Sequence, residues 1–360
     1  MAGSVDPPEG TPGGEDEYRS VVFDESFVRA ARIEEFSARQ RMEEAAPAVR
    51  SRPAPEPGPP RRGYGALLLV PAVMLVFAAV VFVGARHPYP VPAERRAEPL
   101  RTLLVSLAPR GPVPGGRAEE LYARSPAAQF RTGAAGIPLP PGRRTAHFSE
   151  NQVMAALATA KDYLVRSSLD IGVLRGEALR PVRLLLDPDQ AAQFDRSLDA
   201  PADDGRHAPA GWLVRFDPRA VTPVATARVR GTLSVSEVSP DLLEVASDHT
   251  FAYALRPARS APGRPAAATA SLFTVRRELR FRFDREDLRM HRTELLESRA
   301  LAGPQDCAAG AGTGELRPLT AGRTATRPDP AAVATDPYEI GRPVTPLCGT
   351  LSPAGEPEER

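Results

Sequence analysis

The chain has little of several residue types on which enzymes and nucleic-acid-binding proteins depend. Only five histidines, two cysteines and one tryptophan occur among 360 residues. No HExxH or CxxC spacing is present, which excludes the common zinc motifs. No GxSxG or SxxK motif marks a catalytic serine. The formal net charge of +1 excludes the overall basic character of a nucleic-acid-binding domain. The sequence therefore predicts no catalytic residue, no metal, no cofactor, no nucleic-acid partner and a non-enzymatic role.

The two cysteines, Cys307 and Cys348, lie in the C-terminal part of the chain. An even number of cysteines suits an oxidising compartment. A Cys307–Cys348 disulfide would close a loop of roughly 40 residues and stabilise the fold by about 3–4 kcal/mol. The alternative is two unpaired thiols in a flexible tail.

Proline and glycine are abundant instead, with 40 and 28 residues. This is too many for one compact fold of this length, so part of the chain must be linker. We expect a disordered start at residues 1–17 and a Pro-rich linker at 47–62. We also expect a longer Pro/Gly-rich linker region, outside the membrane, at 86–145 and a loosely ordered tail at 301–360.

One long run has no charge at all. Gly63–Ala85 contains 23 uncharged residues between Arg61-Arg62 and Arg86-His87. A helix of about 20 apolar residues crosses a hydrocarbon core about 30 Å thick. A buried core helix or a signal peptide fits less well, because the run is long and some 60 residues precede it. The sequence therefore predicts a single transmembrane helix at 63–85.

The flanking charges and the cysteines suggest the orientation. Four arginines lie within about 15 residues before the run and three after it, which weakly favours a cytoplasmic N-terminus. The cysteine pair favours an oxidising location for the C-terminal part. We expect a single-pass protein of the cell membrane with an extracytoplasmic C-terminal domain.

Residues 18–46 have the features of a cytoplasmic amphipathic helix. The segment up to Glu44 contains no Pro or Gly, and Asp24 or Ser26 can cap the start of a helix. One interpretation is a helix that binds a cytoplasmic partner or the membrane face; the other is a partly helical tail that contacts nothing. The expected partner-binding residues are Phe23, Phe27, Ile33 and Phe36.

Residues 146–300 have the pattern of an α+β domain. Helical periodicity at Asn151–Leu169 and Pro188–Leu198 is followed by a change to period two. We expect N-terminal helices packed on a curved antiparallel sheet, an order also found in nuclear transport factor 2-like folds. The expected strands are Gly211–Asp217, Ala227–Val235, Leu243–Leu255, Phe273–Phe283 and Leu288–Leu296, with a turn at Arg285–Asp287.

The two faces of this sheet suggest different binding hypotheses. Arg276, Arg280 and Arg282 share a face that could meet an acidic partner or polymer, although Glu278 and nearby acids could simply balance it. The other face could form an apolar pocket for lipid or a wall fragment, unless its side chains fill the core. The residues expected around such a pocket are His249, Phe251, Tyr253, Phe281 and Phe283.

Five segments of the chain match a known family of proteins: Val21–Met42, Arg124–Gly136, Thr145–Val153, Ser247–Ala258 and Leu272–His291. The whole chain resembles this family, which consists of single-pass membrane proteins from filamentous, spore-forming actinobacteria. Members of the family look like companions of proteins implicated in spore-wall synthesis. The resemblance implies a non-enzymatic interaction or scaffold role in a cell-wall or spore-wall synthesis complex, with membrane or wall-synthesis proteins as partners. It implies no site residues.

Overall fold

The computed structural model describes residues 71–79, 81–82, 95–258, 269–307, 314–326, 334–339 and 348–357. The chain divides into two units, Met1–Tyr89 and Pro90–Arg360. In the first unit, residues 71–79, 81 and 82 are helical, and their large apolar side chains are exposed. Among the described residues, no helix has both the length and the hydropathy needed to cross a membrane.

Several expected segments therefore lie outside the described residues. These are the disordered start, the amphipathic helix with Phe23, Phe27, Ile33 and Phe36, the Pro-rich linker and most of the 63–85 run.

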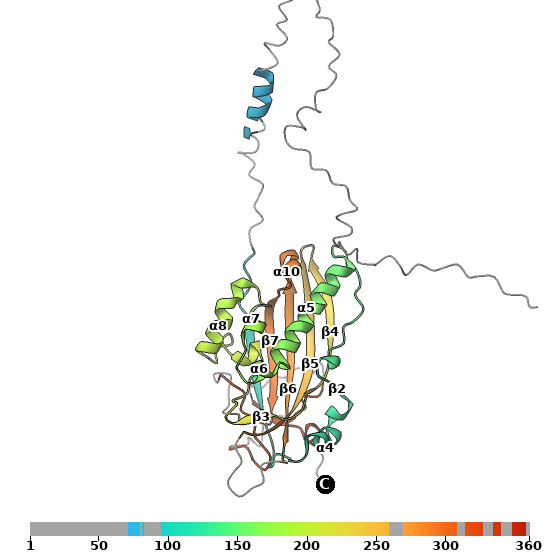
Figure 1. The fold of residues 1–360 in the computed structure, drawn as a ribbon, viewed down its shortest axis with the longest axis vertical. Helices are drawn as coiled ribbons and strands as arrows, with labels where there is room; N and C mark the ends of the chain where they lie inside the picture. Colours follow the sequence, from blue (N-terminus) through green and yellow to red (C-terminus); the bar gives the residue numbers. More distant parts are fainter. Residues whose placement is uncertain are drawn as a thin grey trace, which may run out of the picture. The chain divides into compact units, whose positions relative to one another are not determined.

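The second unit is built on a mixed β-sheet, which confirms the α+β class (Figure 1). Its centre is a four-strand antiparallel meander in which each strand pairs with the next. The alternation of apolar and polar residues recognised in the sequence accounts for these strands, because successive side chains point to opposite faces. The four strands are β4 (Arg228–Ser239), β5 (Leu242–Pro257), β6 (Ser271–Phe283) and β7 (Glu294–Gly303).

The sheet continues beyond the meander with strands that the sequence did not suggest. β1 (Arg101–Ala108) pairs in parallel with β7 and with β9 (Cys348–Leu351). β8 (Ala334–Thr335) pairs with the far side of β9. At the other end of the sheet, β2 (Arg131–Thr132) pairs with β4. The short β3 (Val221–Pro223) pairs with β5. The sheet is thus mixed rather than purely antiparallel.

Two predicted boundaries are therefore wrong. Residues 86–145 are not simply a linker, because β1 is an integral strand with five consecutive buried residues at its C-terminal end. Residues 301–360 are not simply a loose tail, since β7 runs to Gly303 and β9 adds a strand next to β1. Cys307 and Cys348 are disulfide-bonded, with their Cα atoms 5.5 Å apart, and so tie β9 to the segment after β7.

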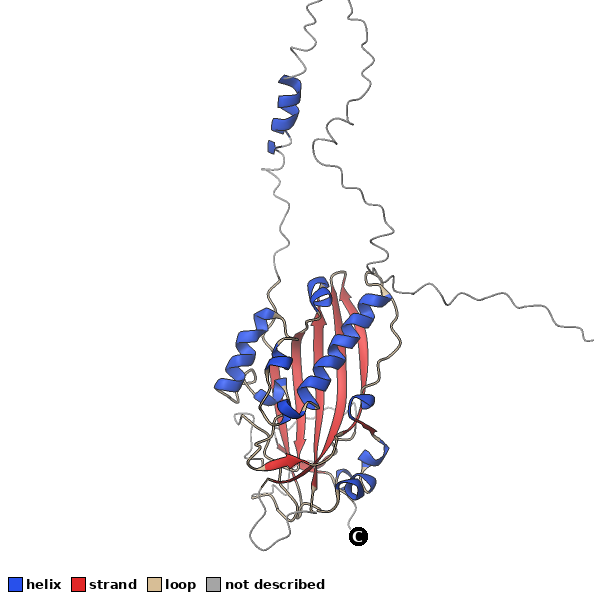
Figure 2. Cartoon of the chain, viewed as in Figure 1, coloured by secondary structure: helices blue, strands red, loops and turns tan. Residues whose placement is uncertain are grey.

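One long helix, α5 (Glu150–Ser168), lies across one face of the meander (Figure 2). Its start is fixed by a capping box in which the Ser149 hydroxyl accepts from the Gln152 backbone and the Gln152 side chain accepts from the Ser149 backbone. Val153, Leu157 and Leu164 lie on the buried side of the helix, one or two turns apart. The main hydrophobic core fills the layer between α5 and the sheet.

Shorter helices complete the second unit. The expected helix at 188–198 is present as a 3-10 turn and α8. The expected strand at 211–217 is wrong, because Gly211 and Trp212 end a helical turn. The short helices are α4 (Ala118–Ala123), α6 (Ile171–Leu174), α7 (Arg180–Arg183), α8 (Ala191–Asp199), α9 (Pro209–Trp212) and α10 (Arg285–Met290), with 3-10 turns η1 (Pro126–Gln129), η2 (Gly133–Gly136), η3 (Pro188–Gln190) and η4 (Pro353–Gly355).

Candidate functional site: a charged face of the sheet

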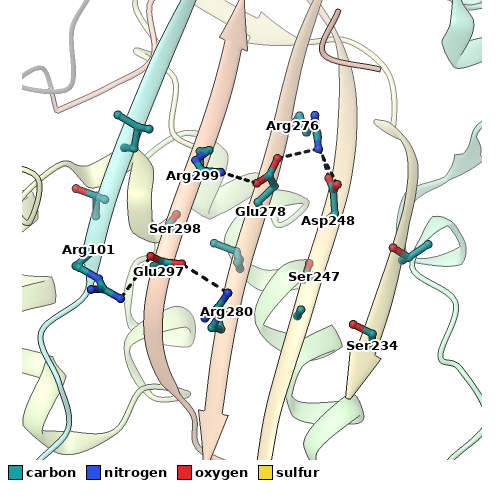
Figure 3. A pocket seen from close by; sticks show the side chains of 15 residues that line it. Arg101, Ser234, Ser247, Asp248, Arg276, Glu278, Arg280, Glu297, Ser298 and Arg299 are labelled. Carbon is teal, nitrogen blue, oxygen red and sulfur yellow. Dashed lines mark hydrogen bonds and ion pairs between the residues drawn. The ribbon is translucent and has the colours of Figure 1, made fainter. Parts of the chain in front are cut away.

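The face of the sheet opposite α5 carries charged side chains from neighbouring strands (Figure 3). They surround a shallow depression of about 670 Å³. One end of this face is covered by α4 and Tyr338, which pack on Ala252, Ala254 and Leu272. The middle of the face stays open. The lining residues that carry charge are Arg101, Asp248, Arg276, Glu278, Arg280, Glu297 and Arg299.

Three of these side chains form one row across the strands. Glu297 of β7 is paired in register with Arg101 of β1 on one side and Arg280 of β6 on the other. Its carboxylate lies 3.4 Å from the Arg101 guanidinium and 4.0 Å from that of Arg280. The Arg101 and Arg280 side chains are 67 % and 52 % exposed. Two exposed guanidinium groups thus share one carboxylate through long contacts, which hold them weakly.

The neighbouring charges are bound much more tightly. Arg276 donates to both carboxylate oxygens of Asp248, at 2.9 and 2.8 Å, and lies 2.7 Å from Glu278. Glu278 also pairs with Arg299 at 3.2 Å. Burial disfavours the charged Arg276 guanidinium, but the hydrogen bonds to Asp248 and the nearby carboxylates hold its pKa above the usual value. Arg276 also donates to the Glu339 carbonyl at 2.7 Å, so this part of the face supports the fold.

The three arginines expected to share a face do so, but they differ in accessibility. Arg276 is almost completely buried. Arg282 is held by Glu244 at 3.1 Å and Glu98 at 2.7 Å. Arg280 is the one that points into the open depression with only a long contact to a carboxylate. Acidic residues balance most of the arginine charge, which was the alternative to an acidic partner in the sequence interpretation of this face.

The depression as a whole keeps a small excess of positive charge. Four arginines and three carboxylates line it. The exposed side chains of Thr232, Ser234 and Ala246 also line it. Such a face can bind a partner through ion pairs and hydrogen bonds.

The expected apolar pocket is instead a packed core. His249, Phe251, Tyr253, Phe281 and Phe283 are each 2 % exposed or less. Because α5 covers their face of the sheet, these side chains fill the layer between helix and strands. Phe281, for example, packs edge-to-face against Tyr163 of α5, with ring centroids 5.5 Å apart.

The most unusual buried residue is Arg277, which sequence reasoning assigned no role of its own. Its guanidinium donates to the hydroxyls of Ser167 and Ser168 at 2.8 and 2.9 Å and to the Gly211 carbonyl at 3.1 Å. The two serines end α5, where the partial negative charge of the helix dipole favours a cation. Burial lowers the pKa of Arg277. Arg277 therefore caps the C-terminal end of α5. The sequence signal for this role was an arginine at a core-facing position of β6, between aromatic residues.

Two other histidines lie beside carboxylates. His147 Nδ1 lies 2.6 Å from the Glu237 carboxylate, and His207 Nδ1 lies 2.6 Å from that of Asp204. His291 ends α10 in the left-handed conformation, with φ of 53°. In the part of the chain that the structure describes, no group of three or more His, Cys, Asp or Glu side chains could hold a metal ion.

Comparison with protein-family models, curated proteins and solved structures gave no match for this chain.

Proposed function

We propose that this chain is a single-pass membrane protein whose extracytoplasmic domain binds an acidic partner protein through the charged face of its sheet. Its role is that of a non-enzymatic scaffold in a cell-wall or spore-wall synthesis complex. The observation that carries the binding proposal is the row Arg101–Glu297–Arg280, in which two exposed guanidinium groups share one carboxylate.

Two further features support the location. The charge-free run 63–85 is long enough for a membrane span. The Cys307–Cys348 disulfide suits an oxidising compartment outside the cytoplasm. On the cytoplasmic side, the helix expected at 18–46 recruits a second partner through Phe23, Phe27, Ile33 and Phe36.

The fold fits this role better than the alternative of a pocket for lipid or a wall fragment. The meander covered by α5 supports a nuclear transport factor 2-like layering, although β1 adds a parallel strand to it. The face that could form an apolar pocket is filled by core side chains. The charged face, in contrast, is open and has room for a partner.

The binding proposal is tested with the full chain in detergent and immobilised poly-L-glutamate as an acidic probe. The double variant R101E/R280E should bind at least tenfold more weakly, because it reverses both exposed charges. The variant E297Q should bind more tightly, because it frees both guanidinium groups from their shared carboxylate. R166E is the matched control, since Arg166 is an exposed ion-paired arginine on α5, which covers the other face. Equal binding by R101E/R280E and R166E would contradict the proposal.

The orientation is tested with a cysteine placed at Arg166. A thiol reagent that does not cross membranes should label R166C in intact cells. Labelling only after lysis would place the domain in the cytoplasm.

A further inference from the structure

β4 forms an outer edge of the sheet that is mostly unpaired. β2 pairs only with Arg228 and Val229 of this strand. From Arg230 to Ser239, β5 pairs with one side. On the other side, no strand and no backbone hydrogen bond meets β4 among the described residues. A strand edge of this kind offers a row of free backbone donors and acceptors for another strand.

The middle of this edge, residues 231–236, lacks the usual protective features. Proteins normally blunt an exposed edge with lysine, proline, inward charges or a bulge. Residues 231–236 read GTLSVS, without charge or proline, and a register shift comes only between Glu237 and Ser239. Thr232, Ser234 and Ser236 are exposed.

The chain segment between η2 and α5 contacts the core and side chains of both α5 and β4. After η2, Leu139 packs against the main core. A Cβ atom at Gly142 would lie 2.5 Å from the Met154 side chain of α5, and the His147 backbone N–H donates to the Glu237 carboxylate of β4 at 3.0 Å. Among the described residues, no backbone hydrogen bond joins this segment to β4.

We propose that β4 pairs with β4 of a second copy of this chain, antiparallel, across a two-fold axis at Ser234. In this register Leu233 lies opposite Val235 of the second copy, and Thr232 lies opposite Ser236. Aliphatic side chains thus meet on the core side and hydroxyl side chains on the outer side. The strand has three charged residues. Arg228 is already paired with β2, and Arg230 and Glu237 lie opposite uncharged residues of the second copy, so no like charges face each other.

The pairing uses backbone groups of β4 and does not require the charged side chains of the depression. Anchoring two copies in one bilayer would raise the effective concentration of the two edges.

Cross-linking tests the register directly in the full chain. Cysteine at Ser234 should form a disulfide-linked dimer under mild oxidation, because the two Ser234 residues face each other about 4.5–5.5 Å apart. T232C alone should not cross-link, since two Thr232 residues are offset by four positions, roughly 13 Å. Mixing T232C with S236C should restore the cross-link. Absence of the S234C dimer, or equal cross-linking of T232C alone, would overturn the proposal.

A charge at the edge tests the pairing without cysteine. S234K places two ammonium groups opposite each other and should weaken the dimer at least tenfold, measured by analytical ultracentrifugation in detergent. A246K is the matched control, because Ala246 is exposed on the same face and is paired with Ser234 one strand further in. A monomeric unmodified chain, or equal dimerisation of S234K and A246K, would contradict the inference. The double variant R101E/R280E, whose substitutions lie on β1 and β6, should dimerise like the unmodified chain, which separates this test from that of the proposed function.

Discussion

His249 on β5 lies directly opposite Arg277 on β6, and both side chains are fully buried. Two nitrogen-rich side chains can share this part of the core because only Arg277 needs a charge. The His249 Nδ1 atom lies 2.8 Å from the Ser247 hydroxyl, a contact that a neutral imidazole can make. Burial lowers the pKa of His249 to about 4, so the ring stays neutral at physiological pH.

The lowered pKa of His249 predicts a loss of stability in mild acid. The unfolded chain binds a proton at this histidine below about pH 6.5, whereas the folded chain binds it only near pH 4. The free energy of unfolding should therefore fall as the pH drops from about 6.5 to about 4, by up to about 3 kcal/mol from this residue.

Replacing His249 by Gln should remove that part of the pH dependence. Urea unfolding followed by the fluorescence of Trp212, the single and fully buried tryptophan, measures it at pH 7 and at pH 4.5. The difference between these two pH values should be smaller in H249Q than in the unmodified chain. An equal difference in both would show that folding does not lower the pKa of His249.

Arg277 should be far more important for stability than an exposed arginine. R277M leaves the Ser167 and Ser168 hydroxyls and the Gly211 carbonyl without their donor at the end of α5. We expect a loss of about 3 kcal/mol or more, the usual cost of unpaired buried polar groups. R299M is the control, because Arg299 is 41 % exposed and its ion pair contributes less than about 1 kcal/mol. Similar unfolding midpoints for the two variants would contradict the capping role.

The meander and α5 could be predicted from the sequence because their signals are local. The alternation in Phe273–Phe283 and the cap at Ser149 each depend on neighbouring residues only. The faces followed from the same alternation, so Arg276, Arg280 and Arg282 were grouped correctly. What the sequence could not decide was whether the opposite face formed a pocket or a core, since that depends on where α5 lies.

The missed elements depend on distant partners or on short, ambiguous signals. β1 is a short apolar run in a Pro/Gly-rich region, and it is a strand because β7 and β9 pair with it. The Arg285–Asp287 turn is instead the start of α10, which Asp284 and Asp287 begin with a capping box. This helix displaces the last strand of the meander, so β7 starts at Glu294 rather than at 288. Arg280 is weakly paired because its guanidinium lies 4.0 Å from the Glu297 carboxylate. A distance between side chains on two strands cannot be predicted from a sequence pattern.

Asp287 predicts a second and opposite pH dependence. Burial, together with Asp284, Asp187 and Glu294, raises the pKa of its carboxyl group to about 7. Between about pH 4 and pH 7 the folded chain therefore binds this proton more tightly than the unfolded chain, so stability falls as the pH rises through that range.

The variant D287N should be more stable than the unmodified chain at pH 8, by up to about 4 kcal/mol. Asparagine has no charge to bury, and its carbonyl oxygen can still accept the backbone hydrogen bond from Asp284. Near pH 4 the two proteins should have similar unfolding midpoints in urea. A loss of stability in D287N at pH 8 would mean that the carboxylate charge itself supports α10.

The disulfide between Cys307 and Cys348 should stabilise the sheet through β9. The bond closes a loop with a sequence separation of 41 residues, for which chain entropy alone gives about 4 kcal/mol. β9 pairs with β1, and Leu351 packs with Val105, Leu107 and Leu301. The double variant C307S/C348S should therefore unfold at a lower urea concentration, and added reductant should shift the unmodified chain to nearly the same midpoint. As a control, reductant should leave the midpoint of C307S/C348S unchanged. If reductant does not shift the unmodified chain either, while thiol titration shows that both cysteines are reduced, the contacts of β9 with β1 alone hold this strand in place.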